Sequence, residues 1–312
     1  MPFLIIIPII VVSLASIILY SQPNSRVAPY PEPVVSLASP STSPSAKPAN
    51  SPTPSATPAF QIQQRIESKE APPTPTPTPK PVLPTMTPSS GSNISTGGNY
   101  TVLTFDIGAT TVVTDSANDD DCSNNCPAKP LAQYVAENGG KAGINGTYFC
   151  PPDYGWCSGK INTYDFPVWN NRKKRWMRSD TLFWNGRGMM VFRSGSVQFF
   201  PCAACVGAPS DITGGIVNYP SLIAGGNTVL DEGSLTDNLR VTKGTRSGIG
   251  FGGGKLFLVV ARSANMSDMV NIFKALGATD ALNLDGGGSS ALYNGGYRVG
   301  PGRNLPNALV IK

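Results

Sequence analysis

The chain has 312 residues and a formal net charge of +5, with 24 Lys and Arg against 19 Asp and Glu and no histidine. The absence of histidine excludes a Ser-His-Asp or Cys-His nucleophile, a His-ligated zinc site and a histidine general base. Any chemistry must use carboxylates, Lys, Arg, Tyr, Cys thiolates or an oxygen-ligated metal ion, and the moderate charge argues against nucleic acid as a partner.

The N-terminus carries an uncharged apolar run over residues 3–20. This run is just long enough to cross a bilayer core of roughly 30 Å. No basic segment precedes it and no Ala-x-Ala site follows, so residues 1–20 are predicted to be an uncleaved signal anchor or an atypical signal peptide. A buried core segment is the alternative, but nothing adjacent can bury it. We expect a membrane-anchored or secreted protein with the rest of the chain extracytoplasmic.

Residues 21–98 are rich in Pro, Ser and Thr, with Thr-Pro alternation over Pro73–Pro79. Such a composition supplies no core and favours extended polyproline II, about 3 Å per residue. The segment is predicted to be a disordered linker. Residues 99–312 then form one domain, of a size that allows a full hydrophobic core.

Hydrophobic periodicity predicts the elements of this domain. Alternating apolar runs predict strands over Thr101–Phe105, Gly188–Phe192, Val197–Phe200, Leu256–Ala261, Ala281–Leu284 and Ala308–Ile311. Helices are predicted over Leu131–Glu137 and over Ser267–Leu276, with Ser267 as the cap. The second helix leads into a buried strand, as in α/β connections, whereas the Gly-rich remainder favours antiparallel pairing. We therefore expect an α+β fold, a single mixed-sheet domain with helices.

The six cysteines fall into close pairs, Cys122 with Cys126, Cys150 with Cys157, and Cys202 with Cys205. Behind an export segment, this spacing favours three short-loop disulfides, although the sequence leaves cross-pairing open. The C-x-x-C of the last pair also allows a redox site or half a zinc site. No second such motif completes four metal ligands.

Two charged stretches have simpler interpretations than ligand binding. Asn118–Asn125 places oxygen side chains at alternate positions, like a calcium loop, but lacks the expected Gly and terminal Glu, so a solvated loop is predicted. Arg172–Arg178 is a basic cluster around Trp176 that suits an anionic wall polymer or lipid headgroups. A solvated loop is again the preferred interpretation.

The strongest candidate site begins at Asp285, directly after the apolar run 281–284. It continues with Gly286, Gly287, Gly288 and Ser289. Consecutive glycines allow unusual backbone angles and close approach to a ligand, their N–H groups can converge on an anion, and Ser289 adds a hydroxyl. A tight turn capped by an aspartate is the alternative.

Two other Gly-containing segments carry candidate side chains. Asn145 and Tyr148 offer an amide and a phenol to sugar hydroxyls, unless they only form a turn packed on the core. Lys243 and Arg246 precede a predicted strand, and a guanidinium can hold a phosphate with paired donors. A surface ion pair is the alternative for these cations.

Four blocks in this order resemble the phosphodiester glycosidase family: Asn145–Phe149, Pro220–Asn227, Thr245–Gly250 and Asn283–Ser290. The resemblance covers most of residues 99–312, and its most specific block is Asn-Leu-Asp-Gly-Gly-Gly-Ser. It implies hydrolysis of the bond between a sugar anomeric carbon and a phosphodiester. The implied partner is a sugar-phosphodiester or a phosphate-containing envelope glycan.

The resemblance also implies roles for individual residues. Asp285, Arg246 and Asn145 are the implied catalytic residues; the implied substrate-binding residues are Tyr148, Asn283, Gly286, Gly287, Gly288, Ser289 and Lys243. Asp285 is expected to be an ionised base or nucleophile with a pKa kept low by a neighbouring cation, while Arg246 and the glycine N–H groups stabilise the departing phosphate. A divalent cation, if used, would be oxygen-ligated.

One departure from the family concerns the second acid. Many relatives place an aspartate after the aromatic pair, whereas here Cys150 and two prolines follow, which leaves Asp153 as the nearest substitute. Two other functions remain open at this point, since one fold hosts many activities. They are a non-catalytic envelope glycan-binding module and a glycosidase of envelope polysaccharide acting on bonds without phosphate.

Overall fold

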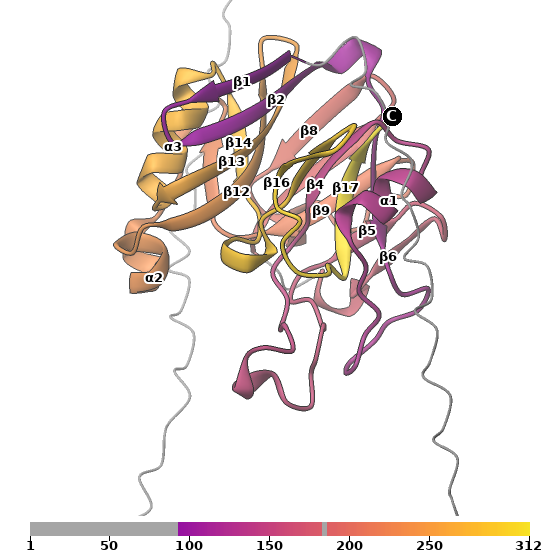
Figure 1. The fold of residues 1–312 in the computed structure, drawn as a ribbon. Helices are drawn as coiled ribbons and strands as arrows, with labels where there is room; N and C mark the ends of the chain where they lie inside the picture. The colour runs from indigo at the N-terminus through magenta and orange to yellow at the C-terminus, as the bar shows by residue number, and fades with distance from the viewer. Residues whose placement is uncertain (1–92, 183–185) are drawn as a thin grey trace, which may run out of the picture. The chain divides into compact units, whose positions relative to one another are not determined.

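In the computed structural model of the chain, the strands form three antiparallel sheets (Figure 1), and residues of all three contribute to a central hydrophobic core. The structure describes residues 93–182 and 186–312, which all belong to one compact unit. The predicted membrane segment and most of the predicted linker lie outside these residues. Every strand pair in the described ranges is antiparallel.

The first sheet has seven strands. Their order is β1 (Asn93–Gly97), β2 (Tyr100–Asp106), β13 (Lys255–Ala264), β12 (Gly244–Gly252), β14 (Asp280–Asn283), β10 (Ser221–Ala224) and β11 (Asn227–Thr228).

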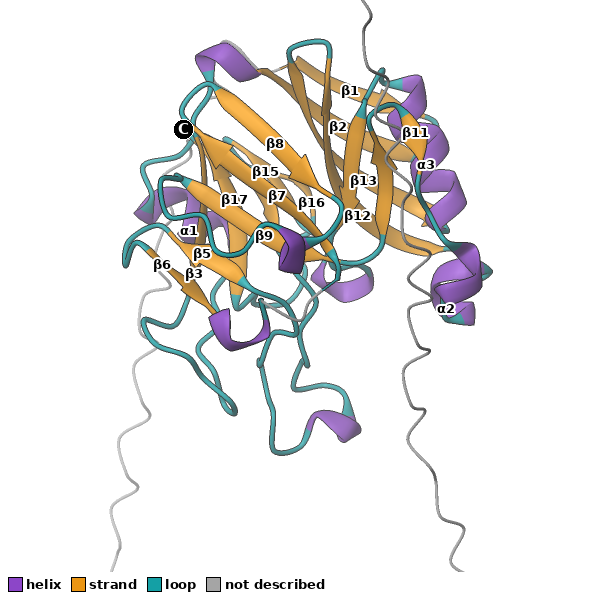
Figure 2. Ribbon diagram, turned by 180° about the vertical axis from the view of Figure 1, so that it is seen from behind, coloured by secondary structure: helices purple, strands orange, loops and turns teal. Residues whose placement is uncertain are grey.

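The other two sheets have five strands each, and the third packs across β3 of the second (Figure 2). The second sheet has the order β16 (Tyr297–Val299), β15 (Leu292–Asn294), β4 (Ala142–Asn145), β17 (Asn307–Ile311) and β3 (Val112–Ser116). The third has the order β6 (Arg175–Met177), β5 (Val168–Asn170), β9 (Gly214–Asn218), β7 (Gly188–Arg193) and β8 (Ser196–Phe200).

Few helices accompany the sheets. The α-helices are α1 (Leu131–Glu137), α2 (Asp237–Arg240) and α3 (Met266–Ala275). The 3₁₀ turns are η1 (Ile107–Ala109), η2 (Gly155–Cys157), η3 (Ser179–Thr181), η4 (Ala203–Cys205), η5 (Glu232–Ser234) and η6 (Gly287–Ser289).

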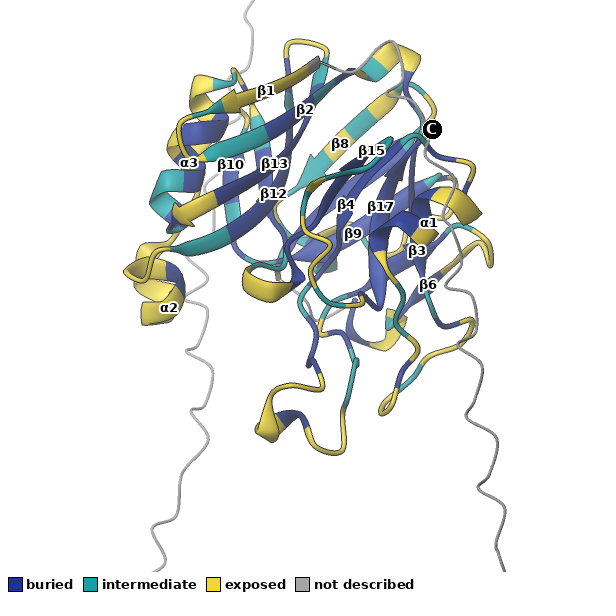
Figure 3. Cartoon of the chain, viewed as in Figure 1, coloured by how far each residue is buried: buried dark blue, intermediate teal, exposed yellow. Residues whose placement is uncertain are grey.

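Strand β13 shows how the layers are built, because both of its faces are buried (Figure 3). Leu256, Leu258 and Val260 point into the central core shared by the three sheets. The alternate residues Phe257 and Val259 point into a second core beneath α3. A strand buried on both faces appears in the sequence as a continuous apolar run, which is why it was predictable.

Strand β12 is rich in glycine, and the sequence did not predict it. A Cβ atom at Gly248 or at Gly250 would lie 2.8 Å from the ring of Phe273 on α3. These two glycines therefore let the helix approach the sheet closely. Glycine has poor strand propensity, so the strand forms because of its neighbours rather than its own composition.

All six predicted strands and both predicted helices are present, with three corrections. Helix α3 begins with a capping box between Asn265 and Asp268, each side chain accepting at 2.9 Å from the other's backbone N–H, so the cap predicted at Ser267 is wrong. Strands β13 and β14 both pair antiparallel with β12, so they run parallel to each other and α3 joins them in the expected crossover. Three sheets, however, replace the single mixed sheet. Strand β1 begins at Asn93, inside the segment assigned to the linker.

The three predicted disulfides join Cys122 to Cys126, Cys150 to Cys157 and Cys202 to Cys205. Cross-links of this number favour an extracytoplasmic or secreted domain. Within residues 93–182 and 186–312, no helix combines the length and hydrophobicity needed to span a bilayer.

The acidic and basic stretches bind each other instead of forming separate solvated loops. Asp119 pairs with Arg172 at 2.9 Å and with Lys173 at 3.0 Å. Arg172 also reaches the fully buried Asp115, whose two carboxylate oxygens accept from its Nε at 3.0 and 2.9 Å. Asn138 donates to the same carboxylate at 2.9 Å. Much of the basic cluster is therefore already neutralised within the fold.

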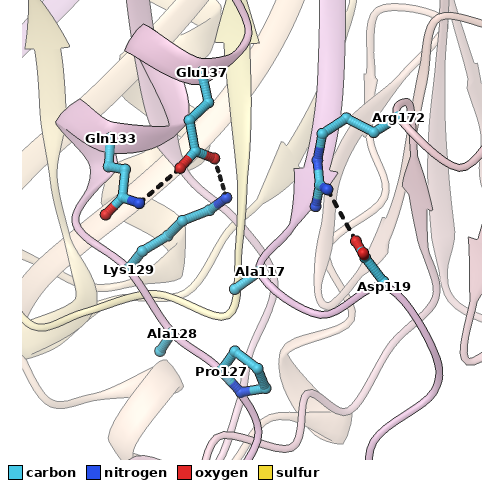
Figure 4. A pocket seen from close by; sticks show the side chains of 8 residues that line it. All are labelled: Ala117, Asp119, Pro127, Ala128, Lys129, Gln133, Glu137 and Arg172. Atoms are coloured by element: carbon cyan, nitrogen blue, oxygen red, sulfur yellow. Dashed lines mark hydrogen bonds and ion pairs between the residues drawn. The ribbon is translucent and has the colours of Figure 1, made fainter.

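This network borders a surface pocket of about 640 Å³ beside α1 (Figure 4). Its four charged side chains form two ion pairs, Arg172 with Asp119 and Lys129 with Glu137. Because its charges are paired with one another, the pocket has the character of a structural ion-pair cluster.

Arg172→Ala should destabilise the domain by about 2 kcal/mol, because a buried carboxylate loses charged donors while water reaches only part of the site. Arg175→Ala is the matched control. Its partner Asp120 is 86% exposed, and such pairs contribute about 0.5 kcal/mol or less. Urea unfolding measures both changes, and equal effects would contradict the role assigned to Asp115.

Candidate active site

A cavity of about 330 Å³ opens where β12 begins and β14 ends. Helix α2 flanks this end of the sheet (Figure 1). The cavity is lined by Tyr148, Phe149, Pro151, Tyr154, Asn238, Leu239, Gly244, Thr245, Arg246, Asp285, Gly286, Gly287 and Arg303. The predicted Asp-Gly turn therefore faces a cavity rather than the hydrophobic core.

Three fully buried asparagines lie behind this cavity, each the last residue of a strand in a different sheet: Asn145 of β4, Asn218 of β9 and Asn283 of β14. Asn145 Nδ2 donates to the carbonyl of Asp285 at 2.8 Å, and Asn218 Nδ2 donates to the carbonyl of Asn283 at 2.7 Å. The side-chain amides thus tie the ends of three sheets to the segment that carries Asp285.

Asn145 holds Asp285 rather than facing the cavity. Its Oδ1 accepts from the N–H of Ala291 at 3.1 Å, while the N–H of Asp285 donates to the carbonyl of Gly146 at 3.0 Å. The segment from 285 to 291 is thereby fixed at both ends. The geometry makes Asn145 a positioning residue, in contrast to the catalytic role expected from the sequence.

The surroundings of the Asp285 carboxyl shift its pKa. It accepts from the N–H of Gly286 at 2.8 Å and from the hydroxyl of Ser289. Burial nevertheless raises the pKa of Asp285 to about 7, against the lowering effects of these bonds and of the charge on Arg303. The expected low pKa is therefore wrong, because desolvation outweighs the neighbouring cation.

Arg246 is 6% exposed and lines the cavity. Its guanidinium donates to the carbonyls of Ala264, Asn238 and Thr242, so it also ties β12 to α2 and to the end of β13. Burial lowers the pKa of Arg246, yet an arginine remains charged at neutral pH. Arg246 therefore places a positive charge at the cavity, and its hydrogen bonds also hold neighbouring elements together.

Arg303 is a second cation at the site, and sequence reasoning missed it. Its Nη1 donates to Ser289 Oγ at 3.3 Å, its Nη2 pairs with Asp153 at 2.7 Å, and its guanidinium lies 5.2 Å from the ring centre of Tyr154. A Cβ at Gly288 would lie 2.7 Å from Nη2. The glycine turn therefore makes room for this arginine. Its position directly after Gly300-Pro301-Gly302 is the sequence feature that could have identified it.

The remaining glycines give the turn its shape. Gly287 has φ +58°, a left-handed value that favours glycine, and a Cβ at Gly286 would lie 2.8 Å from the carbonyl of Thr245. In the described part of the chain, the N–H groups of Gly287 and Gly288 have no acceptor. They are oriented by the turn and available to a ligand.

Tyr148 lines the cavity, and Asn283 supports it from behind. Asn283 Nδ2 donates to the phenol oxygen at 2.7 Å. Burial, and then the charge of Asp285, raise the pKa of Tyr148, so its phenol stays protonated and can donate a hydrogen bond. Lys243 instead pairs with Asp268 at 3.1 Å, outside the cavity lining.

Asp165 is the second carboxyl close to Asp285, and nothing in its sequence context marked it. Its N–H donates to the carbonyl of Tyr148 at 2.9 Å, and its charge raises the pKa of Asp285. Partial burial raises the pKa of Asp165 as well. Asp153, the acid considered from the sequence, is engaged with Arg303. In the described ranges, no three carboxylate or thiol side chains gather to hold a metal ion.

A family model described as phosphodiester glycosidase matches residues 138–312, a span that includes all of the residues lining the cavity. The chain belongs to the phosphodiester glycosidase family. No curated protein matches it.

Two solved structures resemble this phosphodiester glycosidase domain in fold. A hypothetical protein from Synechocystis is 14% identical with a TM-score of 0.53, and the match covers 70% of this chain but 61% of that one. The catalytic domain of zebrafish N-acetylglucosamine-1-phosphodiester alpha-N-acetylglucosaminidase, auto-inhibited by its pro-peptide, is 15% identical with a TM-score of 0.52. That match covers 74% of this chain and 85% of that one. At these identities the likeness shows a shared fold.

Asp285→Asn should stabilise this phosphodiester glycosidase domain above neutral pH. Folding raises the pKa of Asp285 to about 7, so the folded state binds more protons and the group lowers stability as pH rises from about 4 to 7. The variant lacks that penalty. Its free energy of unfolding should match that of the parent near pH 3 and exceed it by about 1 kcal/mol or more at pH 8, after allowance for the part of Asp285 open to the cavity. A variant less stable than the parent at pH 8 would contradict the burial of the charge.

Proposed function

We propose that the domain hydrolyses the bond between the anomeric carbon of a sugar and the phosphate of a phosphodiester. The observation that carries this proposal is a carboxyl with a pKa of about 7 on the wall of a cavity that also holds two arginines, Arg246 and Arg303. Family membership supports a glycosidase, and the name of the zebrafish relative supports a phosphodiester substrate.

The proposed leaving group explains why one positioned carboxyl suffices. A glycosidase whose leaving group is an alcohol needs a general acid to protonate the departing oxygen. A phosphate monoester departs with its charge spread over several oxygens. The Arg303 guanidinium and the free N–H groups of Gly287 and Gly288 suit the stabilisation of that charge, with Arg246 adding a buried positive field.

In the proposed step, a water oxygen bonds to the anomeric carbon as the bond from that carbon to the ester oxygen breaks. The bonding electron pair leaves with the phosphate, and Asp285 takes the proton from the water. A base with a pKa near 7 combines basicity with a large ionised fraction at neutral pH, so we assign Asp285 as base rather than nucleophile. The O–H of Tyr148 is positioned to orient a sugar hydroxyl or the water.

We further infer that the substrate lies in the cell envelope, as a sugar-phosphodiester or a phosphate-containing glycan. The three disulfides support a location outside the cytoplasm. The apolar run over residues 3–20, followed by the Pro-rich linker, would hold the domain at a membrane surface.

Asp285→Asn should lower the rate of sugar release from a sugar phosphodiester by about 10²–10⁴-fold, as expected for loss of a general base. In the parent, kcat/KM should fall below about pH 7 as Asp285 becomes protonated. Asp165→Asn removes a charge that raises this pKa, so the acid limb should move to lower pH. An Asp285→Asn variant with parental activity, or an acid limb unmoved by Asp165→Asn, would contradict the assignment.

Arg303→Ala should reduce kcat/KM for the phosphodiester by about 100-fold and for a neutral aryl glycoside of the same sugar far less, because it removes charge-assisted donors to phosphate. Arg246→Ala should act in the same direction and also lower the free energy of unfolding, since three carbonyls lose their donor. Lys243→Ala is the control, because that ammonium lies outside the cavity. Equal losses on both substrates would favour a glycosidase of bonds without phosphate, and binding without release of sugar would favour a glycan-binding module.

A further inference from the structure

The disulfide between Cys202 and Cys205 differs from the other two in its exposure. Cys205 is exposed and Cys202 is partly exposed. Each of the other disulfides includes a buried cysteine, since Cys126, Cys150 and Cys157 are 2%, 9% and 0% exposed. A disulfide is broken when a thiolate reaches one of its sulfur atoms, so exposed disulfides are the labile ones. Exposure therefore singles out the C-x-x-C pair as the one that an external thiol can reach.

Backbone hydrogen bonds hold the turn that carries this disulfide. Ala203 is fully buried, and its N–H donates to the carbonyl of Arg187 at 2.8 Å. The carbonyl of Ala203 accepts from the N–H groups of Val206 and Gly207, both at 3.1 Å. None of these bonds involves a sulfur atom, and a cross-link that closes so short a loop adds less stability than one that closes a long loop. The turn is thus built to keep its shape when the disulfide is reduced.

The two sulfur atoms have different surroundings. The N–H of Cys205 donates to Sγ of Cys202 at 3.2 Å, and also to the carbonyl of Cys202 at 3.2 Å. The bond to sulfur becomes stronger when Cys202 is a thiolate, because the acceptor is then charged. Cys205 therefore presents the sulfur that an incoming thiolate attacks, and Cys202 provides the sulfur that leaves.

An apolar side chain adjoins the exposed sulfur. Val206 follows Cys205 directly in the chain and is 41% exposed. It offers a contact to the surface around a thiol on another protein, and a small thiol has no such surface. The neighbourhood of Cys205 therefore favours a protein thiol over a small one.

We propose that the Cys202–Cys205 disulfide is a thiol–disulfide exchange site that oxidises a dithiol on another protein. A thiolate of that protein attacks Sγ of Cys205, the bond between the two sulfurs of this chain breaks, and its electron pair leaves with Cys202. The second thiolate of the partner then attacks the partner's sulfur in the mixed disulfide, and Cys205 leaves. The partner gains a disulfide, while Cys202 and Cys205 become thiols with the two protons that the partner loses. This site is separate from the proposed hydrolysis and does not depend on it.

The first test measures which disulfide is reduced. The full chain is incubated with excess reduced thioredoxin, as a protein dithiol, or with glutathione at the same thiol concentration. Samples are quenched with acid and alkylated, and the cysteines are mapped by mass spectrometry. Cys202 and Cys205 should be reduced at least about 10-fold faster than the other two pairs, and glutathione should form its mixed disulfide on Cys205. Equal rates for the three disulfides, or a mixed disulfide chiefly on Cys202, overturn the proposal.

The second test asks whether the partner is a protein. Val206→Ser should slow reduction by thioredoxin about 5-fold and change the rate with glutathione by less than about twofold. Val229→Ser, which alters an apolar side chain that is 39% exposed elsewhere in the domain, is the matched control and should change neither rate. Reduction by glutathione at the thioredoxin rate or faster, or equal effects of Val206→Ser on both reductants, would assign the site to small thiols and overturn the protein partner.

The third test separates a redox site from a structural cross-link. Replacing Cys202 and Cys205 together by serine should lower the Tm by less than about 8 °C, as expected for loss of a very short closed loop. The same replacement of Cys150 and Cys157, whose sulfurs are buried, should lower it more. A Cys202→Ser, Cys205→Ser protein that fails to fold, or that loses more stability than the Cys150→Ser, Cys157→Ser protein, would show that the disulfide is structural.

Discussion

The site depends on buried side-chain amides that join the ends of three sheets. Asn145, Asn218 and Asn283 each end a strand, and the first two hold the backbone around Asp285 through its own carbonyl and that of Asn283. A buried amide left without partners costs free energy, so each of these bonds favours one register of the sheet ends. Precise placement of the Asp285 carboxyl follows from this network, although none of the three asparagines lines the cavity.

Burial gives Asp285 its chemical character and also a stability cost. Desolvation raises its pKa to about 7 in spite of two hydrogen bonds and the charge of Arg303. An ionised carboxylate there is poorly solvated and therefore a better base than one on the surface. The same desolvation opposes folding at alkaline pH, which is the usual relation between a functional site and the stability of its host.

The two arginines divide the positive charge between inner and outer positions. Arg246 is locked by three backbone carbonyls, so its field is fixed whether or not a substrate is present. Arg303 is held by Asp153 and Ser289 and lies over the ring of Tyr154, which also lines the cavity. Together the two arginines place positive charge on the wall of the cavity that holds Asp285.

The elements that could be predicted from the sequence are those with local signals. These are the apolar strand β13, the helix α1, the three short-loop disulfides and the Asp-Gly turn, because strand alternation, helical periodicity and short loop closure involve only neighbouring residues. The other features depend on contacts between segments that are far apart in the chain. Strand β12 exists because its glycines admit Phe273, and Arg303 and Asp165 reach Asp285 from distant segments. The pKa of Asp285 is raised where a lowered pKa was expected, because burial depends on the whole fold and no local pattern encodes it.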